Sequence, residues 1–408
     1  MAQSRPTVVM LTPDRQIDRR ILLQADSLEA DGWGVTIIAM PLDTQAEDDR
    51  RVVRIGVGPA GAARRENLVL NAYRWVRHHV PMNGYLMRWM KRLAWRYLVD
   101  QESFYTRLFY STASRYAPKV FVAHDLPMLP VAKRLATACG ARLVYDSHEL
   151  YSEQEFSGRE KRRWADIEAR YIGACDAVIT VNQLIATELE RRYGIAHVHV
   201  ILNAERSIGE VQNTRALHRV FGLAPEQKVL LMQGGLSAGR HLDVLVDAMA
   251  HVHDRSIVLV VLGDGLLQTQ LQARARSAAT AGRVCFHPAV PQKELLSFTA
   301  AADAGVIPYQ ATCLNNYYCT PNKLFEFIAA GIPILGSDLP EIRRLVVGQQ
   351  IGMVGNMQSA MDMAALIDAF FSDARRLSAW RDNLLVTRQS VCWQVEEKKL
   401  LKIYRALP

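Results

Sequence analysis

The chain has 408 residues, of which 50% are hydrophobic and 22% are charged. This length predicts two or three domains, and the composition excludes a disordered protein, which would have fewer apolar residues and less balanced charge. The formal net charge is +8, yet eight Lys and Arg residues and only one acid fall within residues 64–98. Most of the positive excess therefore belongs to one segment.

Neither a targeting segment nor a membrane-spanning segment is evident. The first residues lack an apolar run with a basic flank, and no stretch approaches the ~18 apolar residues expected of a membrane span. The six cysteines are scattered without Cys-x-x-Cys pairs, so we expect reduced thiols and no metal site. These features predict a cytoplasmic protein.

The first half of the chain alternates between short apolar runs and amphipathic stretches. Residues 7–12 predict a strand, residues 18–31 an amphipathic helix and residues 35–39 a second strand. Runs that are apolar on both faces and separated by helices indicate a parallel sheet covered by helices. Further strands are predicted at residues 120–123, 143–145 and 177–181.

A polar connector at about residues 201–212 precedes a second series of the same kind. We therefore predict an α/β protein with two Rossmann-like, doubly wound domains that face a central cleft, over residues 1–207 and 208–385. Residues 386–408 are predicted to form a C-terminal helix that packs back on the first domain. The strands expected in the second domain lie at residues 229–233, 257–262, 284–286, 304–307 and 332–335.

One helix of the second domain can be delimited from its chemistry. Thr320 is expected to cap the first turn, and Pro321 suits the first helical position because its missing N–H would be unpaired there. Gly331 and Pro333 are expected to end the helix. Taken alone, these signals also fit an ordinary surface helix.

The start of this helix has the features of an anion site. The N–H groups of Asn322, Lys323 and Leu324 would point out of the helix start, where the dipole favours an anion. A lysine at this position opposes the dipole unless an anion is present. Glu326 lies one turn further in, where its carboxylate can accept two hydrogen bonds from a ribose diol.

Glycine-rich turns follow two strands of the same domain. Gly234 and Gly235 let the backbone approach a phosphate, and Arg240 can bind that phosphate through two N–H groups. Gly263 and Asp264 lie in the second of these turns. Because open α/β sheets bind ligands beyond the carboxyl ends of their strands, the turns and the helix start predict one crevice. Taken alone, each of these turns could equally be a tight turn that binds no phosphate.

These motifs resemble those of retaining glycosyltransferases of family 4, which have the two-domain GT-B fold. The resemblance covers nearly the whole chain and is strongest over residues 229–341. Residues 233–236 with Arg240 resemble the family's diphosphate turn, with Gly235 in place of the usual Arg and Arg240 in place of the usual Lys. The segment that ends at Val290 resembles the one whose backbone meets the nucleotide base.

The family's Glu-x7-Glu pattern places its second acid on Glu326 and its first on Tyr318. The resemblance thus implies that Glu326 contacts the ribose and that Tyr318 lies where the sugar hydroxyls are held. The Pro-Asn-Lys-Leu-Phe-Glu run that starts at Pro321 is similar to that of bacterial members that build cell-surface polysaccharides. The implied acceptor is therefore a glycan, which we expect to be lipid-linked.

The resemblance also implies that sugar transfer retains the anomeric configuration. The nucleotide-sugar is a substrate, so no cofactor is expected. Arg240, Lys323 and the helix start would stabilise the leaving diphosphate, and no metal ion is needed where two cations neutralise it. The leaving phosphate could take the acceptor's proton. The residues expected to act in catalysis are His124, Arg240, Lys323 and Glu326.

Histidines and acids follow two adjacent strands of the first domain. His124 and Asp125 follow one strand, and His148 and Glu149 follow the next. Side chains of these types can bind the hydroxyls of a sugar acceptor and handle a proton. A structural role is the alternative, and it stays open most clearly for His148 and Glu149.

A basic aromatic segment lies within residues 64–98. Such a sequence suits the anionic inner face of a membrane. The alternative is a helix whose tryptophans pack on the domain, and no motif for nucleic-acid binding accompanies the segment. The residues expected to meet the membrane are Arg88, Trp89, Lys91, Arg92, Trp95 and Arg96.

Two other functions remain open. A nucleotide-sugar epimerase on the same fold would consume donor without an acceptor. A binding subunit that has lost catalysis is also conceivable, because Tyr318 stands where the family has an acid. Conversion of donor without acceptor would favour the first, and donor that binds without reacting would favour the second.

Overall fold

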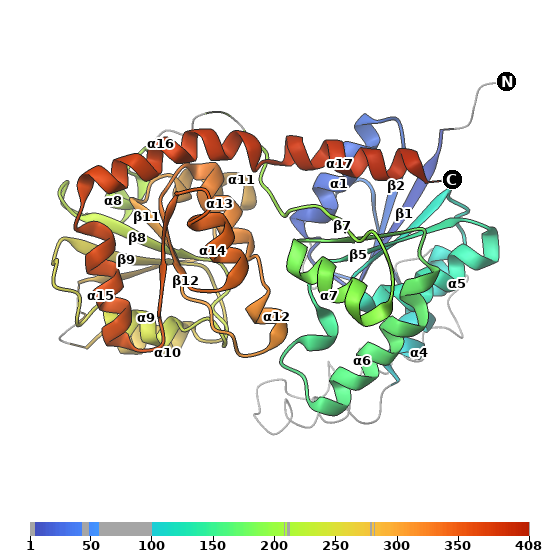
Figure 1. The fold of residues 1–408 in the computed structure, drawn as a ribbon, viewed down its shortest axis with the longest axis horizontal. Helices are drawn as coiled ribbons and strands as arrows, with labels where there is room; N and C mark the ends of the chain where they lie inside the picture. Colours follow the sequence, from blue (N-terminus) through green and yellow to red (C-terminus); the bar gives the residue numbers. More distant parts are fainter. Residues whose placement is uncertain are drawn as a thin grey trace. The chain divides into compact units, whose positions relative to one another are not determined.

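The computed structural model describes residues 5–42, 49–56, 100–207, 209, 213–277, 280 and 282–407 (Figure 1). The basic aromatic segment lies outside these residues. The chain divides into two compact units, here called the N-terminal unit (Met1–Ile201 with Glu397–Pro408) and the C-terminal unit (Leu202–Glu396). The first division, after Ile201, falls a few residues before the predicted boundary at 207. The second, after Glu396, falls within the last helix.

The N-terminal unit is built on a parallel sheet with the order β3-β2-β1-β4-β5-β6-β7. The order reverses between β1 and β4, and such a switch point is where doubly wound sheets bind ligands. The strands are β1 (Thr7–Thr12), β2 (Gly34–Ala39), β3 (Val52–Arg54), β4 (Val120–His124), β5 (Arg142–Ser147), β6 (Ala177–Thr180) and β7 (His199–Val200).

Helices cover this sheet, and local chemistry sets their ends. Asp18 caps the first helix by accepting the N–H of Arg20, and Ser157 forms a capping box with Glu160. Gly140 ends another helix at a φ of 72°. The helices are α1 (Arg19–Ala30), α4 (Gln101–Ala113), α5 (Leu129–Cys139), α6 (Gly158–Tyr171) and α7 (Gln183–Tyr193).

The C-terminal unit has a second parallel sheet, with the order β10-β9-β8-β11-β12-β13 and a switch point between β8 and β11. Val229 and Leu231 belong to one apolar cluster and Leu230 and Met232 to another, so both faces of the sheet are covered. The strands are β8 (Lys228–Gln233), β9 (Ile257–Leu262), β10 (Val284–His287), β11 (Ala304–Ile307), β12 (Ile334–Ser337) and β13 (Gly352–Gly355).

The helices of this unit alternate with its strands, as the sequence pattern predicts (Figure 1). They are α8 (Ala216–Phe221), α9 (Leu242–Ala248), α10 (Gln268–Ala275), α11 (Gln292–Thr299), α12 (Leu314–Tyr317), α13 (Asn322–Ala330), α14 (Pro340–Val346), α15 (Ala360–Phe371) and α16 (Ala374–Ser390).

The last helix, α17 (Trp393–Ala406), ends on the N-terminal unit. The ring of Tyr404 lies 5.9 Å from that of Trp33, edge to face, and Arg405 pairs with Asp31. The predicted fold class, two Rossmann-like domains with parallel sheets, is confirmed. All six cysteines are free thiols. Among the described residues, no helix has both the length and the apolar character of a membrane span.

Candidate donor and acceptor sites

Two cations and a glycine turn meet at the carboxyl end of β8, beside the switch point of the C-terminal sheet. Gly234 has a φ of 102°, and a Cβ built there would lie 3.8 Å from Cε of Lys323 and 4.0 Å from Nη1 of Arg240. Both glycines of the turn, Gly234 and Gly235, are exposed. The structure thus brings together residues that lie about 90 positions apart in the chain, as an anion site requires.

Arg240 lies over the glycine turn. Its Nη1 donates to the carbonyl oxygen of Gly235 at 2.7 Å and lies 3.3 Å from a Cβ built on Gly235. The guanidinium therefore occupies space next to Gly235 that a larger side chain would compete for. This chain has a glycine where the resembled family has an arginine, and Arg240 stands in place of the family's lysine.

Lys323 is buried, with only 4% of the residue exposed. Its Nζ lies 3.7 Å from Sδ of Met232 and 5.0 Å from the ring centre of Tyr309, and the guanidinium of Arg240 lies 5.4 Å from the same ring. Burial and the charge of Arg240 lower the pKa of Lys323 to about 7, although Glu326 opposes them. An incoming anion would therefore meet a lysine that is easily charged.

Glu326 is half-buried on α13 and held by a hydrogen-bonded chain. Nε2 of Gln233 donates to Oε2 of Glu326 at 2.5 Å, and the hydroxyl of Thr299 lies 2.9 Å from Oε1 of Gln233. Gln233 is only 1% exposed. Local sequence pattern does not reveal Gln233 and Thr299 as supports of Glu326, and the one available signal is a glutamine at the end of a buried strand.

The start of α13 differs from the prediction. The helix begins at Asn322, and Pro321 is the N-cap with an extended ψ of 143° and no side-chain hydrogen bond, so Thr320 is not the cap. The N–H of Leu324 donates to the carbonyl oxygen of Pro321 at 2.9 Å and is not available to an anion. Within the described residues, the N–H groups of Asn322 and Lys323 have no hydrogen-bond partner, so the helix start offers two donors rather than three.

The turn after β9 braces the glycine turn. A Cβ on Gly263 would collide with the carbonyl oxygen of Gly234, which explains a glycine with a φ of 145° there. Oδ2 of Asp264 accepts the N–H of Ala289 at 3.0 Å and so ties this turn to the segment before Val290, which packs on the core. Contacts of Gly263, Asp264 and Val290 with a nucleotide stay predictions.

Tyr318, where the resembled family has its first acid, ends the one-turn helix α12. It is half-buried, and its ring lies 5.5 Å from that of Tyr317. Its predicted contact with a donor sugar stays a prediction. Asn322, also predicted to touch the donor, is exposed, and its Oδ1 accepts a hydrogen bond from Asn203 at 3.1 Å.

In the N-terminal unit, the predicted acceptor residues meet at the ends of β4 and β5. Nδ1 of His124 lies 3.1 Å from Nε2 of His148, and both atoms lie 3.4 Å from Oδ2 of Asp146. Asp125 accepts the N–H of His148 at Oδ1 (3.0 Å), and its Oδ2 lies 3.6 Å from Nδ1 of His148. Glu149 lies at the edge of this group, where it accepts a hydrogen bond from Gln154.

The partners of this group on α1 are not evident from the sequence pattern. Nε and Nη2 of Arg20 donate to the two oxygens of Asp146 at 3.0 and 2.9 Å, and Nε2 of Gln24 donates to Oδ2 at 2.5 Å. Arg20, Gln24 and Asp146 are all buried. Burial alone would raise the pKa of Asp146, but Arg20 and His148 hold it well below its usual range.

Asp125 has an unusual backbone. Its φ of 63° and ψ of 161° lie in a region that is nearly restricted to glycine and costs about 1–3 kcal/mol for other residues. The carbonyl oxygen of Asp146 accepts the N–H of Asp125 at 2.9 Å. This conformation places the Asp125 carboxylate against His148, and strain of this kind is typical of functional sites.

The ligand atoms of His124, Asp146 and His148 lie within 4.8 Å of one another. Asp146, however, already accepts two hydrogen bonds from the Arg20 guanidinium, and that positive charge would repel a metal ion. The group therefore fits an ion-pair network rather than a metal site.

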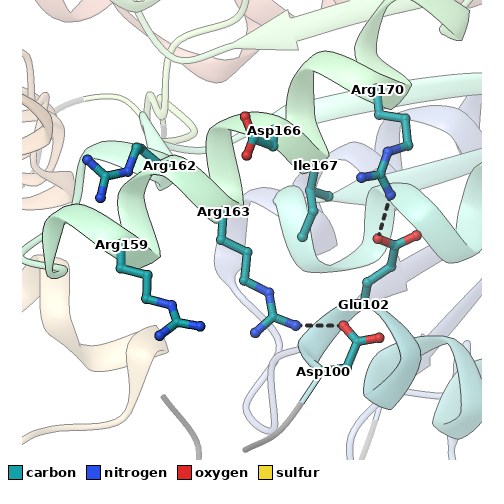
Figure 2. A pocket seen from close by; sticks show the side chains of 8 residues that line it. All are labelled: Asp100, Glu102, Arg159, Arg162, Arg163, Asp166, Ile167 and Arg170. Carbon is teal, nitrogen blue, oxygen red and sulfur yellow. Dashed lines mark hydrogen bonds and ion pairs between the residues drawn. The ribbon is translucent and has the colours of Figure 1, made fainter. Parts of the chain in front are cut away.

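A pocket of about 460 Å³ lies elsewhere on the N-terminal unit, between α6 and the start of α4 (Figure 2). Several arginines line it, but Arg163 pairs with Asp100 at 2.7 Å and Arg170 with Glu102 at 3.1 Å (Figure 2). None of the predicted site residues lines this pocket. It is therefore separate from both candidate sites.

Comparison with known proteins agrees with the two-unit architecture. Residues 17–204 match the family Glycosyl transferase 4-like domain, and residues 213–384 match the family Glycosyl transferases group 1. The chain is 23% identical over 255 residues to a D-inositol 3-phosphate glycosyltransferase of Xylanimonas cellulosilytica, covering 58% of each chain. It is 27% identical over 217 residues to TuaH, a putative teichuronic acid biosynthesis glycosyltransferase of Bacillus subtilis, covering 50% of this chain and 52% of TuaH.

The chain spans about half the length of the relatives that it matches in sequence. The fold is similar to that of Anabaena HepE, solved in complex with UDP and glucose, with a TM-score of 0.71. That likeness covers 98% of this chain and 100% of HepE at 16% identity. At this level of identity, the likeness concerns the fold.

Proposed function

Because the chain belongs to the glycosyltransferases with the GT-B fold, we propose that it transfers a sugar from a nucleotide-sugar to a glycan or lipid-linked acceptor. The observation that carries this proposal is the meeting of Arg240, Lys323 and the start of α13 at the glycine turn, with Glu326 one helical turn away. Two cations and two N–H donors suit a diphosphate, and the carboxylate suits a ribose diol.

The proposed reaction retains the configuration of the sugar and uses neither a metal ion nor a cofactor. The bond between the anomeric carbon and the diphosphate breaks, and the acceptor oxygen forms the new glycosidic bond on the same face of the sugar. The acceptor's proton passes to the departing diphosphate. Arg240, Lys323 and the helix start stabilise the negative charge that develops on the leaving oxygen.

The proposed acceptor belongs to cell-surface polysaccharide synthesis. The name of TuaH, which places that relative in teichuronic acid synthesis, supports this proposal. The basic aromatic segment supports attachment to the inner face of a membrane, with 1 acid against 8 basic residues over residues 64–98. The cluster of His124, Asp125, His148 and Glu149 is proposed to bind the acceptor.

A thermal-shift screen across UDP-, GDP-, ADP- and TDP-sugars tests donor binding. At least one donor should raise the Tm of the chain by several degrees at about 100 times its Kd, because a ligand that binds only the folded state stabilises it by roughly 2.7 kcal/mol. Transfer to an acceptor is then assayed with that donor. A Tm that no nucleotide-sugar changes would contradict the proposal.

Donor affinity is expected to fall as the pH rises above about 7. The pKa of Lys323 is lowered to about 7 in the free protein, so the ammonium is lost above that pH. A bound diphosphate favours the ammonium, so binding at higher pH takes up a proton and Kd rises by up to about tenfold per pH unit. Calorimetry with UDP in buffers of different ionisation enthalpy measures this uptake. A Kd that is the same at pH 6 and pH 8.5 would contradict this role of Lys323.

A further inference from the structure

The carboxylate of Asp146 gathers hydrogen-bond donors from several parts of the N-terminal unit. Arg20 binds both of its oxygens, and Gln24 donates to Oδ2 from the next turn of α1. The third nitrogen of the Arg20 guanidinium, Nη1, donates to the carbonyl oxygen of Ile201 at 2.7 Å. The guanidinium is therefore held at two ends, and its two-point contact sets the position of the Asp146 carboxylate.

The contact between the two histidines allows two proton arrangements, and both ring nitrogens also lie 3.4 Å from Oδ2 of Asp146. Either Nε2–H of His148 donates to Nδ1 of His124, or Nδ1–H of His124 donates to Nε2 of His148. In the first arrangement the proton of neutral His124 is on Nε2, and in the second it is on Nδ1. The first makes His124 a hydrogen-bond donor to a ligand, whereas the second makes it a base.

Charge balance favours the first arrangement. Asp125 and Asp146 both face His148, while Arg20 supplies one positive charge. With Asp125 and Asp146 ionised, a charged His148 brings these four side chains to neutrality. Its Nε2–H then donates to Nδ1 of His124 at 3.1 Å, and its Nδ1–H faces Oδ2 of Asp125 at 3.6 Å. Burial lowers the pKa of His148, but Asp125 and Asp146 outweigh it and raise the pKa to about 10. Because burial raises the pKa of Asp125 to about 7, the carboxylate of Asp146 is the counter-charge that persists below that pH. Burial lowers the pKa of His124, which therefore stays neutral.

The far nitrogen of His124 agrees with a donor role. Nε2 of His124 is buried and has no hydrogen-bond partner in the described parts of the chain. A buried ring nitrogen without a partner is costly in either protonation state, and with the proton on Nε2, as the first arrangement requires, the missing partner is an oxygen acceptor. His124 belongs to the cluster assigned above to the acceptor, and a sugar hydroxyl offers such an oxygen.

We propose that Arg20 and Asp146 are positioning residues that hold His148 as an imidazolium and thereby fix His124 as an Nε2–H donor for a substrate hydroxyl. The role in transfer rests on the proposed function, whereas the protonation pattern does not. Under this assignment His124 takes no proton from the acceptor, in agreement with a reaction in which the leaving diphosphate receives it.

Nitrogen NMR of the full chain with ¹⁵N-labelled histidine tests the protonation pattern without any substrate. His148 should stay doubly protonated, and His124 should stay neutral with its proton on Nε2, from about pH 6 to about pH 8.5. In Asp146→Asn, His148 should lose its second proton within this range. A wild-type His124 with its proton on Nδ1, or a neutral wild-type His148, would overturn the proposal.

Enzyme assays test the role in transfer. Asp146→Asn should lower kcat on the order of 10²-fold at pH 8 with little change in the donor KM, because a misplaced group near the reaction costs about that much. Its activity should recover as the pH falls and His148 regains its proton, which a purely structural role would not produce. Asp14, Asp125 and Glu149 also act on the charges of this group, and they are unchanged in the variant.

A matched control is Asp368→Asn in the C-terminal unit, which removes a carboxylate 2.7 Å from Nδ1 of the exposed His253. Neither kcat nor its pH dependence should change in this control. If Asp146→Asn does not fold, Arg20→Lys keeps the charge but loses the two-point contact, and it should show the same pH-dependent loss. If either folded variant keeps the kcat of wild type at pH 8, the positioning role is overturned. If wild type transfers no sugar but shows the expected NMR pattern, only the proposed function is overturned.

Discussion

Lys323→Met is expected to lower kcat/KM for sugar transfer by about 10²- to 10³-fold, the loss typical of removing one group that stabilises charge in a transition state. Lys323 lies against the glycine turn, within reach of a diphosphate. The protein should remain folded, because an apolar side chain of similar length suits the space between Met232 and Tyr309. Steady-state kinetics with saturating acceptor measure the effect.

The control for this variant is Lys228→Met, which removes a lysine at the opposite end of β8 that pairs with Asp254 at 2.8 Å. Its kcat/KM should be unchanged, since an exposed ion pair contributes little to stability. Arg240→Ala should resemble Lys323→Met, because the two cations act on the same diphosphate. Near-normal turnover in both Lys323→Met and Arg240→Ala would remove the assignment of the donor site.

Glu326→Gln is expected to raise the donor KM by roughly 10²-fold, since two hydrogen bonds to a charged acceptor are each worth about 1.5–3 kcal/mol. Glutamine is nearly the same size as glutamate, so the hydrogen bonds that link Thr299, Gln233 and residue 326 can persist. The same assay with a 2′-deoxyribose donor sharpens the test. Wild type should discriminate strongly against the deoxy donor, and Glu326→Gln should discriminate only weakly.

The control here is Glu226→Gln, an exposed acid before the amino end of β8. Its donor KM and its discrimination against the deoxy donor should equal those of wild type. If Glu326→Gln still discriminates as wild type does, Glu326 does not bind the ribose, and the second half of the site assignment is lost.

Much of the fold follows from short-range pattern. Strands such as β4 and β9 are buried along their whole length, and the apolar runs at residues 120–123 and 257–262 predict that burial. Gly234 and Gly263 predict turns because their φ angles favour glycine, and a Cβ on Gly263 would also collide with the backbone of Gly234. The proximity of Arg240, Lys323 and the glycine turn follows from the rule that ligands bind at the carboxyl ends of parallel strands.

The sequence could not predict the pairings between distant residues. Arg20 and Asp146 are 126 positions apart, and Gln233 and Glu326 are 93 apart. No short-range sequence pattern links residues so far apart, so their contact depends on how α1 and α13 pack on the sheets. The prediction that the N–H of Leu324 faces an anion is also wrong, because the backbone of Pro321 is extended and its carbonyl oxygen accepts that N–H. The positive φ of Asp125 likewise depends on distant residues, Asp146 and His148, whose backbone groups hydrogen-bond to it.

The most direct test of the donor site is a crystal structure of the full chain with the nucleotide-sugar that raises its Tm most. The account predicts the diphosphate against the N–H groups of Asn322 and Lys323, with both cations in contact, and the ribose diol on the carboxylate of Glu326. A nucleotide bound at any other place, or a ribose that does not touch Glu326, would contradict it.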